Sequence, residues 1–453
     1  MIVTVNPATG QVLNEYHAHT PDEVREILDV LEEGWKKWRS LSFAERGRYL
    51  LALAAGLRDE KESCALQISL EMGKPIQLAK AEVEKCALAC ESFAKNAAGY
   101  LDETLVPTEL KKSSIVYQPI GPILGIMPWN YPFWQVFRAA VPALMAGNVF
   151  LLKHAPICTG TALIIESLFK AILPISVFKS IILEEKAVSE LILDSRIKGV
   201  TLTGSVRAGK SVALQAAQGF KKCVLELGGN DPYIVLADAD VQKAADICVQ
   251  ARLANSGQIC IAPKRLIIVQ KVYEAFRASV MERLKDYTCG DPLDENTRLG
   301  PIARQDLRDQ VIKQVDESIA KGAKLLTGGK AVQRPGFYYE PTVLENVKPG
   351  MPAFDEEIFG PVIALIKAQD EEEAVALANQ SPYGLGAGVF TKDLQKGEYL
   401  AKYAIEAGVC YVNGIVSSDP RLPFGGTKAS GLGRELGLAG IREFVNIKTI
   451  GIM

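Results

Sequence analysis

The chain has 453 residues, of which 48% are hydrophobic and 23% charged, and this length and balance predict a globular protein of two or three domains. Its 51 Lys and Arg residues nearly balance its 53 Asp and Glu residues, and the net charge of −2 argues against nucleic acid as a partner. No apolar run reaches about 18 residues and the N-terminus lacks the pattern of a secretory signal, so we expect neither a membrane span nor export.

The first hundred residues are predicted to be helical. In Thr20-Pro21-Asp22-Glu23 a hydroxyl stands at the N-cap, proline at the first helical position and glutamate at the third, which indicates a helix start. Apolar residues at helical spacing follow as far as Trp38, and a second long helix is expected over Ser63–Tyr100. Cys86 and Cys90 share one face of this second helix, where we expect a buried structural pair, because no further metal-ligand pair lies nearby.

From residue 113 short β-rich segments alternate with helical ones. The strand-like segments are Gly121–Met127, Val149–Lys153, Ser180–Leu183, Gly199–Thr203, Cys223–Leu227 and Tyr233–Leu236. The helical segments between them are 159–172, 186–193, 205–219 and 241–254. This alternation predicts a parallel sheet with crossover helices.

A second alternating series occupies the C-terminal half. Its strand-like segments are Leu266–Val269, Val362–Ile366, Gly388–Phe390 and Val409–Val412. Its helical segments are 271–286, 303–321 and 370–379. The sequence therefore predicts two α/β domains.

A phosphate-loop pattern appears at Gly204–Ser211, between a predicted strand and a predicted helix. It raises the hypothesis of a nucleotide triphosphatase. The pattern constrains only four of its eight positions, however, and no clear second strand ending in a magnesium-binding Asp follows. The alternative is that the free N–H groups at Gly204 and Ser205 hold the pyrophosphate of a dinucleotide, and we favour that interpretation.

Cysteine and histidine counts limit the chemistry. Nine irregularly spaced cysteines indicate free thiols in a reducing cytoplasm rather than a disulfide framework. The only histidines are His17, His19 and His154, so hydrolase bases and zinc ligands are scarce. We therefore expect no metal, and chemistry carried by Cys, Glu, Lys, Asn and the backbone.

Three residues stand out as candidates for that chemistry. Cys260 lies in a polar loop, where functional residues gather. The alternative interpretation is that Cys260 is a small residue buried in the core. Glu226 interrupts an apolar strand before two glycines, either to reach water or to serve as a general base with a raised pKa in a dry site. Asn130 follows a predicted strand, at the edge where open α/β sheets bind ligands, or forms a structural turn.

These candidates belong to six motifs that occur in the order and with separations similar to those of a known family. The motifs are Pro128-Trp129-Asn130, Thr203-Gly204-Ser205, Glu226-Leu227-Gly228-Gly229, Gly257-Gln258-Ile259-Cys260, Glu357-Ile358-Phe359-Gly360-Pro361-Val362 and Pro423-Phe424-Gly425-Gly426. Over nearly the whole chain the sequence resembles the aldehyde dehydrogenase superfamily. The resemblance is greatest to its succinate-semialdehyde dehydrogenase branch, through the segments 152–156 and 204–209.

The resemblance implies a domain organisation. It predicts two Rossmann-like parallel-sheet domains with a small β oligomerisation arm. The cofactor-binding domain would comprise residues 1–111 and 121–228, and the catalytic domain residues 229–425. The arm and its strand would be residues 112–120 and 437–453, which implies a homodimer or homotetramer.

The resemblance also implies site residues. Cys260 would be the nucleophile, the Asn130 side chain and the Cys260 backbone N–H would hold the oxyanion, and Glu226 would activate the water that hydrolyses a thioester. The cofactor would be NAD or NADP, with no metal. Its contacts would be Trp129, Lys153, Pro156, Gly204, Ser205, Gly209, Glu226, Leu227, Glu357 and Phe359.

Substrate choice is the least constrained expectation. Arg138, at a position where the branch carries Arg, would bind the carboxylate of a semialdehyde beside Trp134 and Ser418, unless it forms a structural ion pair. Pro156 replaces the Glu of NAD-preferring relatives, and His154 lies close by, which leaves NADP open. We expect oxidation of succinate semialdehyde to succinate. The alternatives are a triphosphatase at 204–211, a broad-specificity aliphatic aldehyde dehydrogenase, or a non-catalytic relative that binds nucleotide.

Overall fold

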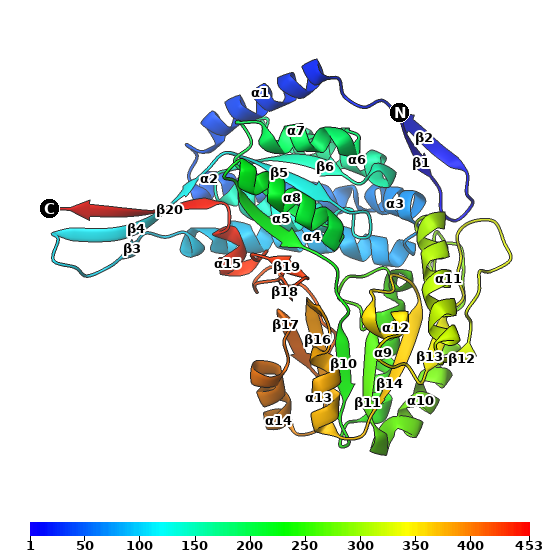
Figure 1. Ribbon diagram of the computed structural model, residues 1–453. Coiled ribbons are helices and arrows are strands. Elements are labelled where there is room, and N and C mark those ends of the chain that lie inside the picture. Colours follow the sequence, from blue (N-terminus) through cyan, green and yellow to red (C-terminus); the bar gives the residue numbers. More distant parts are fainter.

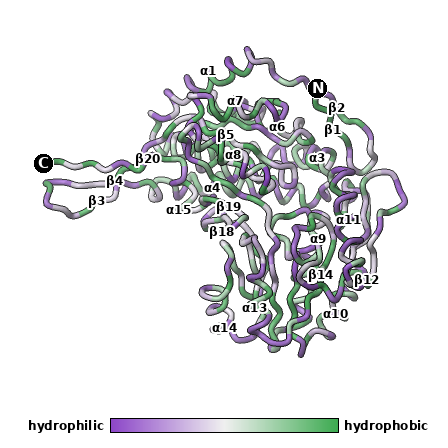
Figure 2. Tube along the Cα trace, in the orientation of Figure 1, coloured by the Kyte–Doolittle hydropathy of each residue, from purple (hydrophilic) through white to green (hydrophobic).

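The computed structural model describes residues 1–453 and contains two large sheets flanked by helices, with a thin arm that projects from the body (Figure 1). Apolar residues concentrate along the strands inside the body, while the outer helices carry most of the polar ones (Figure 2). Both large sheets are mostly parallel, which confirms the predicted α/β class. None of the helices combines the length and apolar character that crossing a membrane requires.

The N-terminal helices are α1 (Pro21–Trp38), α2 (Phe43–Asp59), α3 (Lys61–Met72) and α4 (Ile76–Tyr100). The predicted capping box is present at Thr20 and Glu23, where each side chain accepts from the other residue's backbone N–H. The prediction of a single helix over 63–100 was wrong. It is broken because Gly73 ends α3 in the left-handed conformation, with φ +75°, and Pro75 begins the next helix.

The first large sheet has the strand order β19-β9-β8-β5-β6-β7. Its strands are β5 (Pro122–Met127), β6 (Val149–His154), β7 (Phe178–Ser180), β8 (Gly199–Thr203), β9 (Lys222–Glu226) and the antiparallel edge β19 (Gly431–Leu432). The helices that follow its strands are α5 (Trp134–Met145), α6 (Thr159–Ile172), α7 (Val188–Leu193) and α8 (Val206–Gln218). Strands β5, β8 and β9 run parallel, so their carboxyl ends open on the same edge.

The second large sheet has the order β12-β13-β14-β11-β10-β16-β17. Its strands are β10 (Pro232–Val235), β11 (Arg265–Val269), β12 (Lys324–Thr327), β13 (Thr342–Glu345), β14 (Val362–Ala368), β16 (Gly386–Phe390) and β17 (Val409–Val412). One face packs on α9 (Val241–Leu253) and α10 (Gln270–Leu284), and the other on α11 (Gln305–Ala320) and α13 (Glu371–Asn379). Strands β12 and β13 were not predicted.

The arm is a separate three-stranded sheet with the order β20-β4-β3. Strand β4 (Lys112–Pro119) pairs antiparallel with β20 (Val445–Ile452) along its whole length, and β3 (Thr104–Leu105) pairs with the other edge of β4. Figure 1 shows the arm extending well away from both large sheets, with the C-terminus at its tip. Ile447 and Leu105 on it are exposed to solvent.

Smaller elements complete the chain. These are the hairpin β1 (Ile2–Val5) and β2 (Val12–Tyr16), the pair β15 (Tyr383–Gly384) and β18 (Thr427–Lys428), and the helices α12 (Pro352–Asp355), α14 (Leu394–Tyr399) and α15 (Gly437–Ile441). Residues 227–231 carry the chain from β9 in the first sheet to β10 in the second. The site described next lies where these two sheets meet.

Candidate active site

Cys260 is presented by a tightly constrained turn after α9. Asn255, Ser256 and Gly257 have consecutive positive φ angles of 50°, 56° and 74°. A Cβ at Gly257 would collide with the carbonyl of Gly360, so only glycine fits there. Arg252 braces the turn, because its guanidinium donates to the carbonyls of Gly257 at 3.1 Å, Ile358 at 2.8 Å and Val362 at 2.6 Å. A strained backbone held in this way is typical of a functional site.

Two cavities, each of about 210 Å³, meet at Cys260. We call them the cofactor-side cavity and the substrate-side cavity. The first is lined by Pro128, Trp129, Asn130, Gln135, Thr203, Gly204, Ser205, Leu227, Gly228, Cys260, Leu307, Glu357 and Phe359. The second is lined by Lys85, Tyr131, Trp134, Gln135, Arg138, Gln250, Ala251, Ala254, Ile259, Cys260, Ile261, Ala262, Ile415, Val416, Ser417, Ser418 and Phe424. Only Cys260 and Gln135 line both, so the sulfur-bearing residue stands between the two spaces.

Asn130 is tied to the Cys260 turn from both sides. Its Nδ2 donates to the carbonyl of Gln258 at 3.1 Å, and its own carbonyl accepts from Asn255 Nδ2 at 3.0 Å. An amide nitrogen carries two hydrogens, so one remains for a ligand oxygen in the cofactor-side cavity, which Asn130 lines together with Cys260. The turn after β5 and the turn after α9 therefore form one rigid unit.

Burial raises the pKa of the Cys260 thiol to about 11, although the charge of Lys264 opposes this effect. The Lys264 ammonium donates to the carbonyls of Ile259, at 2.7 Å, and of Cys260 itself, and it pairs with Glu357 at 3.4 Å. The thiol is therefore protonated at neutral pH in the free protein. A thiolate forms there only at high pH or when the site around it changes.

Glu226 ends β9, and both of its carboxylate oxygens are buried without a hydrogen-bond partner. Burial raises its pKa well above the usual range, with Arg138 lowering it and Glu435 raising it further. This direction agrees with the sequence prediction of a dry carboxylate. The side chain, however, lines neither cavity. It packs against Gly425, because a Cβ added to Gly425 would be only 2.7 Å from Glu226 Oε1.

Six of the ten predicted cofactor contacts line the cofactor-side cavity. They are Trp129, Gly204, Ser205, Leu227, Glu357 and Phe359. Ser205 caps α8, since its hydroxyl accepts from the backbone N–H of Ala208 at 3.2 Å, and the helix start faces this cavity. The residues present therefore suit a phosphate-bearing dinucleotide, with the rings of Trp129 and Phe359 edge to face at 5.7 Å.

The remaining predicted cofactor contacts lie elsewhere. Lys153 is at the buried end of β6, Pro156 follows that strand, and Glu226 points away as described. Gly209 packs inside α8, where a Cβ would be 2.5 Å from Leu227, so it lets the helix approach the strand. His154 is not free to meet a phosphate, because its ring bonds the Pro132 carbonyl at 2.9 Å and burial lowers its pKa to about 4.

The triphosphatase hypothesis finds little support here. The predicted strand and helix are present as β8 and α8. Lys210, which a phosphate loop would aim at the phosphates, is exposed and lines neither cavity. No group of three or more His, Cys, Asp or Glu residues is placed to hold a metal ion.

The predicted substrate contacts do line one cavity, but Arg138 is already paired. Its guanidinium forms a buried ion pair with Glu435 and a 3.2 Å hydrogen bond with Thr203 Oγ1, and only 2% of its side chain is exposed. Trp134 Nε1 donates to Ser418 Oγ at 3.0 Å. The structure thus joins Trp134 to Ser418, while the charge of Arg138 is matched within the protein.

Sequence reasoning missed two residues of α4 that shape this site. The Glu82 carboxylate accepts from the backbone N–H groups of Phe133 and Trp134, at 2.8 and 2.9 Å, and so caps α5; Lys74 neutralises it in a buried pair. Lys85 lines the substrate-side cavity and donates to Ser418 Oγ at 2.9 Å. A charged residue on an otherwise small and apolar helix face was the only signal in the sequence.

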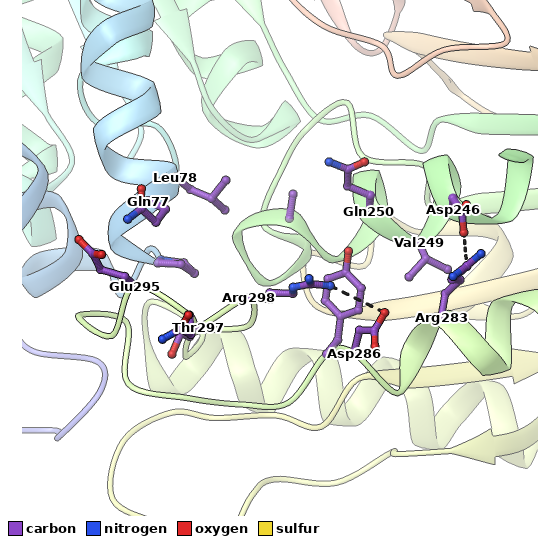
Figure 3. A pocket seen from close by; sticks show the side chains of 14 residues that line it. Gln77, Leu78, Asp246, Val249, Gln250, Arg283, Asp286, Glu295, Thr297 and Arg298 are labelled. Carbon is purple, nitrogen blue, oxygen red and sulfur yellow. Dashed lines mark ion pairs between the residues drawn. The ribbon is translucent and has the colours of Figure 1, made fainter.

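A third cavity, of about 650 Å³, lies between the start of α4, the helices α9 and α10, and the loop 295–298 (Figure 3). Four of its charged side chains pair with one another, Arg283 with Asp246 and Arg298 with Asp286. It contains none of the predicted site residues. It adjoins the substrate-side cavity, because Gln250 and Ala254 line both.

Comparison with known proteins gave consistent matches over the whole chain. The model of the aldehyde dehydrogenase family matches residues 1–450. A probable succinate-semialdehyde dehydrogenase (NADP+) of Synechocystis sp. is 47% identical, covering 100% of this chain and 99% of that protein. An Escherichia coli succinate semialdehyde dehydrogenase (NAD(P)+) is 44% identical, covering 99% and 97%. The crystal structure of succinic semialdehyde dehydrogenase from Streptococcus pyogenes with NADP+ superposes with a TM-score of 0.97 at 35% identity, covering 100% of both chains.

Proposed function

The chain belongs to the aldehyde dehydrogenase family, and from this premise we propose that it oxidises succinate semialdehyde to succinate with NADP+ or NAD+. One observation carries the proposal. Cys260 stands between a cavity that suits a dinucleotide and a second cavity with room for a small aldehyde. A nucleophile in that position can hold a substrate carbon beside a hydride acceptor.

The residues divide the reaction between them. The Cys260 thiol gives up its proton to water and its sulfur adds to the aldehyde carbon, while Asn130 Nδ2 with the Cys260 backbone N–H stabilises the oxyanion. A dinucleotide held by Ser205, Glu357 and Phe359 in the cofactor-side cavity would supply the hydride acceptor, and loss of a hydride from the carbon bound to Cys260 leaves a thioester on the sulfur. Glu226 then takes a proton from the attacking water, and the acid is released with the thiol restored. Because Glu226 lines neither cavity, this step requires its side chain to rotate toward Cys260.

Both dinucleotides fit the proposal. No carboxylate stands at Pro156, so nothing at that position repels the additional phosphate of NADP+. Lys153 supplies a buried positive charge at the end of β6. The two relatives named above carry NADP+ and NAD(P)+ in their names.

We further propose that the chain forms a homodimer or a dimer of dimers through the arm. Strand β20 is the outer strand of its sheet, and a long exposed edge of this kind is expected to have a partner. The division into a cofactor domain and a catalytic domain at residue 228 is supported by the passage between the two sheets there. All nine cysteines are free thiols, which supports a reducing, cytoplasmic location.

The test is the formation of reduced nicotinamide, followed by its absorbance, with succinate semialdehyde and each cofactor. We expect turnover with the wild-type protein and a loss of at least about 10³-fold in Cys260→Ala, because no other nucleophile lines both cavities. Lys210→Ala is the matched control and keeps full activity. An inactive wild type on a panel of aldehydes, or an active Cys260→Ala, would refute the proposal.

A further inference from the structure

We propose that Lys264 is a positioning residue of the oxyanion site, because its ammonium holds the carbonyl of Ile259 and thereby aims the backbone N–H of Cys260. This inference rests on the proposed function, in which that N–H stabilises the oxyanion. Lys264 lies at the end of the loop that carries the sulfur, directly before β11, and it lines neither cavity. It therefore acts through the Cys260 loop and not on a ligand.

The carbonyl of Ile259 and the N–H of Cys260 belong to one peptide unit. This peptide is trans, so the unit is planar and its carbonyl and N–H point in opposite directions. Lys264 Nζ donates to the Ile259 carbonyl at 2.7 Å. The Cys260 N–H is thus directed away from the ammonium, and the position of Nζ fixes the plane in which it points.

The Cys260 N–H itself is unused within the backbone. No main-chain carbonyl accepts a hydrogen bond from it. The carbonyl on the other side of the same peptide is fully used, since Ile259 also accepts from the N–H of Ala262 at 3.2 Å. Unpaired backbone N–H groups are rare where water is restricted. A free donor beside a nucleophile that lines two cavities is placed for a ligand oxygen.

The group that holds this peptide is charged. Lys264 has only 2% of its side chain exposed, and its Nζ also donates to the Cys260 carbonyl and lies 3.4 Å from the Glu357 carboxylate. Hydrogen bonds from an ionised donor are about twice as strong as neutral ones. A carbonyl drawn toward a cation also polarises its peptide, which makes the N–H of that peptide a stronger donor. Lys264 therefore both orients and strengthens the Cys260 donor.

The other polar side chains around the loop hold different atoms. Arg252 donates only to carbonyls outside residues 258–262, and Asn130 Nδ2 donates to the carbonyl of Gln258. Lys264 is the side chain that reaches both carbonyls flanking the Cys260 α-carbon. Without it, the peptide that carries the proposed oxyanion donor has no side chain to fix it.

The experiment compares two reactions of the Cys260 thiolate in the protein without cofactor. The sulfur attacks the carbonyl of p-nitrophenyl acetate, which builds an oxyanion before nitrophenolate leaves. It attacks the methylene carbon of iodoacetamide and displaces iodide, and no oxyanion forms. Nitrophenolate absorbance gives the first rate constant, with Cys260→Ala as background, and mass spectrometry of the Cys260 peptide gives the second. Both reactions need the thiolate, so their ratio cancels any effect of Lys264 on the thiol's ionisation.

For Lys264→Met we expect this acylation-to-alkylation ratio to fall about 10-fold, less than the loss of a whole oxyanion donor produces. Lys264→Arg, which keeps a charged donor, should recover part of the ratio. Asn130→Ala removes the other proposed donor and sets the scale. Lys271→Met, at an exposed lysine at the start of α10, is the control and keeps the wild-type ratio. Circular dichroism checks folding, and Lys264→Gln replaces Lys264→Met if the latter does not fold.

The outcomes separate the two proposals. A lowered ratio in Lys264→Met that Lys264→Arg partly restores supports the positioning role. A wild-type ratio in Lys264→Met, together with a lowered ratio in Asn130→Ala, would overturn it. Neither probe is an aldehyde and neither reaction uses the cofactor, so a wild type that oxidises no aldehyde would overturn the proposed function while the ratio remains measurable.

Discussion

At Cys260 burial stabilises the protonated thiol, and this disfavours the thiolate that an attack on a carbonyl requires. The same cause acts on Glu226, whose pKa is raised well above the usual range. Burial therefore favours the protonated form of both groups, although the proposed reaction uses both as anions. Burial therefore makes the ionisation of both groups harder.

A rising pH profile follows from these two residues. Deprotonation of Cys260 and Glu226 is favoured as pH increases, so we expect kcat/KM with butanal, which has no carboxylate, to rise from about pH 7 upward. In Glu226→Gln the acylation step persists while hydrolysis slows, so a burst of reduced nicotinamide should precede a slow steady state. Stopped-flow absorbance measures both. A linear time course at the wild-type rate would contradict the role of Glu226.

Among the elements, α4 contributes more to the site than its place in the sequence indicates. Glu82 caps α5 and Lys85 lines the substrate-side cavity, so one helix both positions the turn after β5 and lines the pocket. The pair of Glu82 with Lys74 is fully buried, with no exposed side-chain surface on either residue. Removing one member of such a pair leaves the other charge without compensation.

Glu82→Gln should therefore destabilise the fold by about 3 kcal/mol or more, since it leaves Lys74 buried and unpaired. The same substitution at Glu84 is the control on this helix. Glu84 pairs with Arg58 in a salt bridge whose two side chains are about one third exposed, at 36% and 37%, and such pairs contribute no more than about 1 kcal/mol. Urea unfolding compares the two variants. Equal losses of unfolding free energy in the two variants would contradict the larger contribution that we expect from the buried pair of Glu82 and Lys74.

For the whole molecule, the arm is the part that the rest of the fold does not explain. It extends from the body as an isolated three-stranded sheet (Figure 1), and its strand β20 presents Ile447 with 57% of its surface exposed. Small isolated sheets are marginally stable in water without a covering partner. A second copy of the chain would supply that cover, in line with the proposed dimer or tetramer.

Charged substitutions on the arm should separate the subunits. For Ile447→Glu combined with Ile452→Glu we expect the molar mass in multi-angle light scattering to fall to half or less of the wild-type value, because two charges enter an apolar contact. Leu394→Glu, an exposed leucine on α14 far from the arm, is the control and keeps the wild-type mass. A wild-type mass equal to one chain would contradict the proposed assembly.

The sequence by itself determined the class of fold and the parts of the site that local patterns encode. Helix caps such as Thr20 with Glu23, and the alternation of apolar strands with helices, are short-range features that the chain carries in any context. The six motifs likewise indicated that Asn130 and Cys260 lie in turns at the ends of regular elements. The break at Gly73 was missed because it interrupts a helical pattern by only three residues.

Only the tertiary structure decided how charges are distributed among these residues. Arg138 meets Glu435 rather than an open cavity, and Lys85 meets Ser418 from 333 residues away. The Glu226 carboxylate lies against Gly425, outside both cavities. Pairing and burial depend on which distant segments pack together, and a linear sequence does not specify these contacts residue by residue.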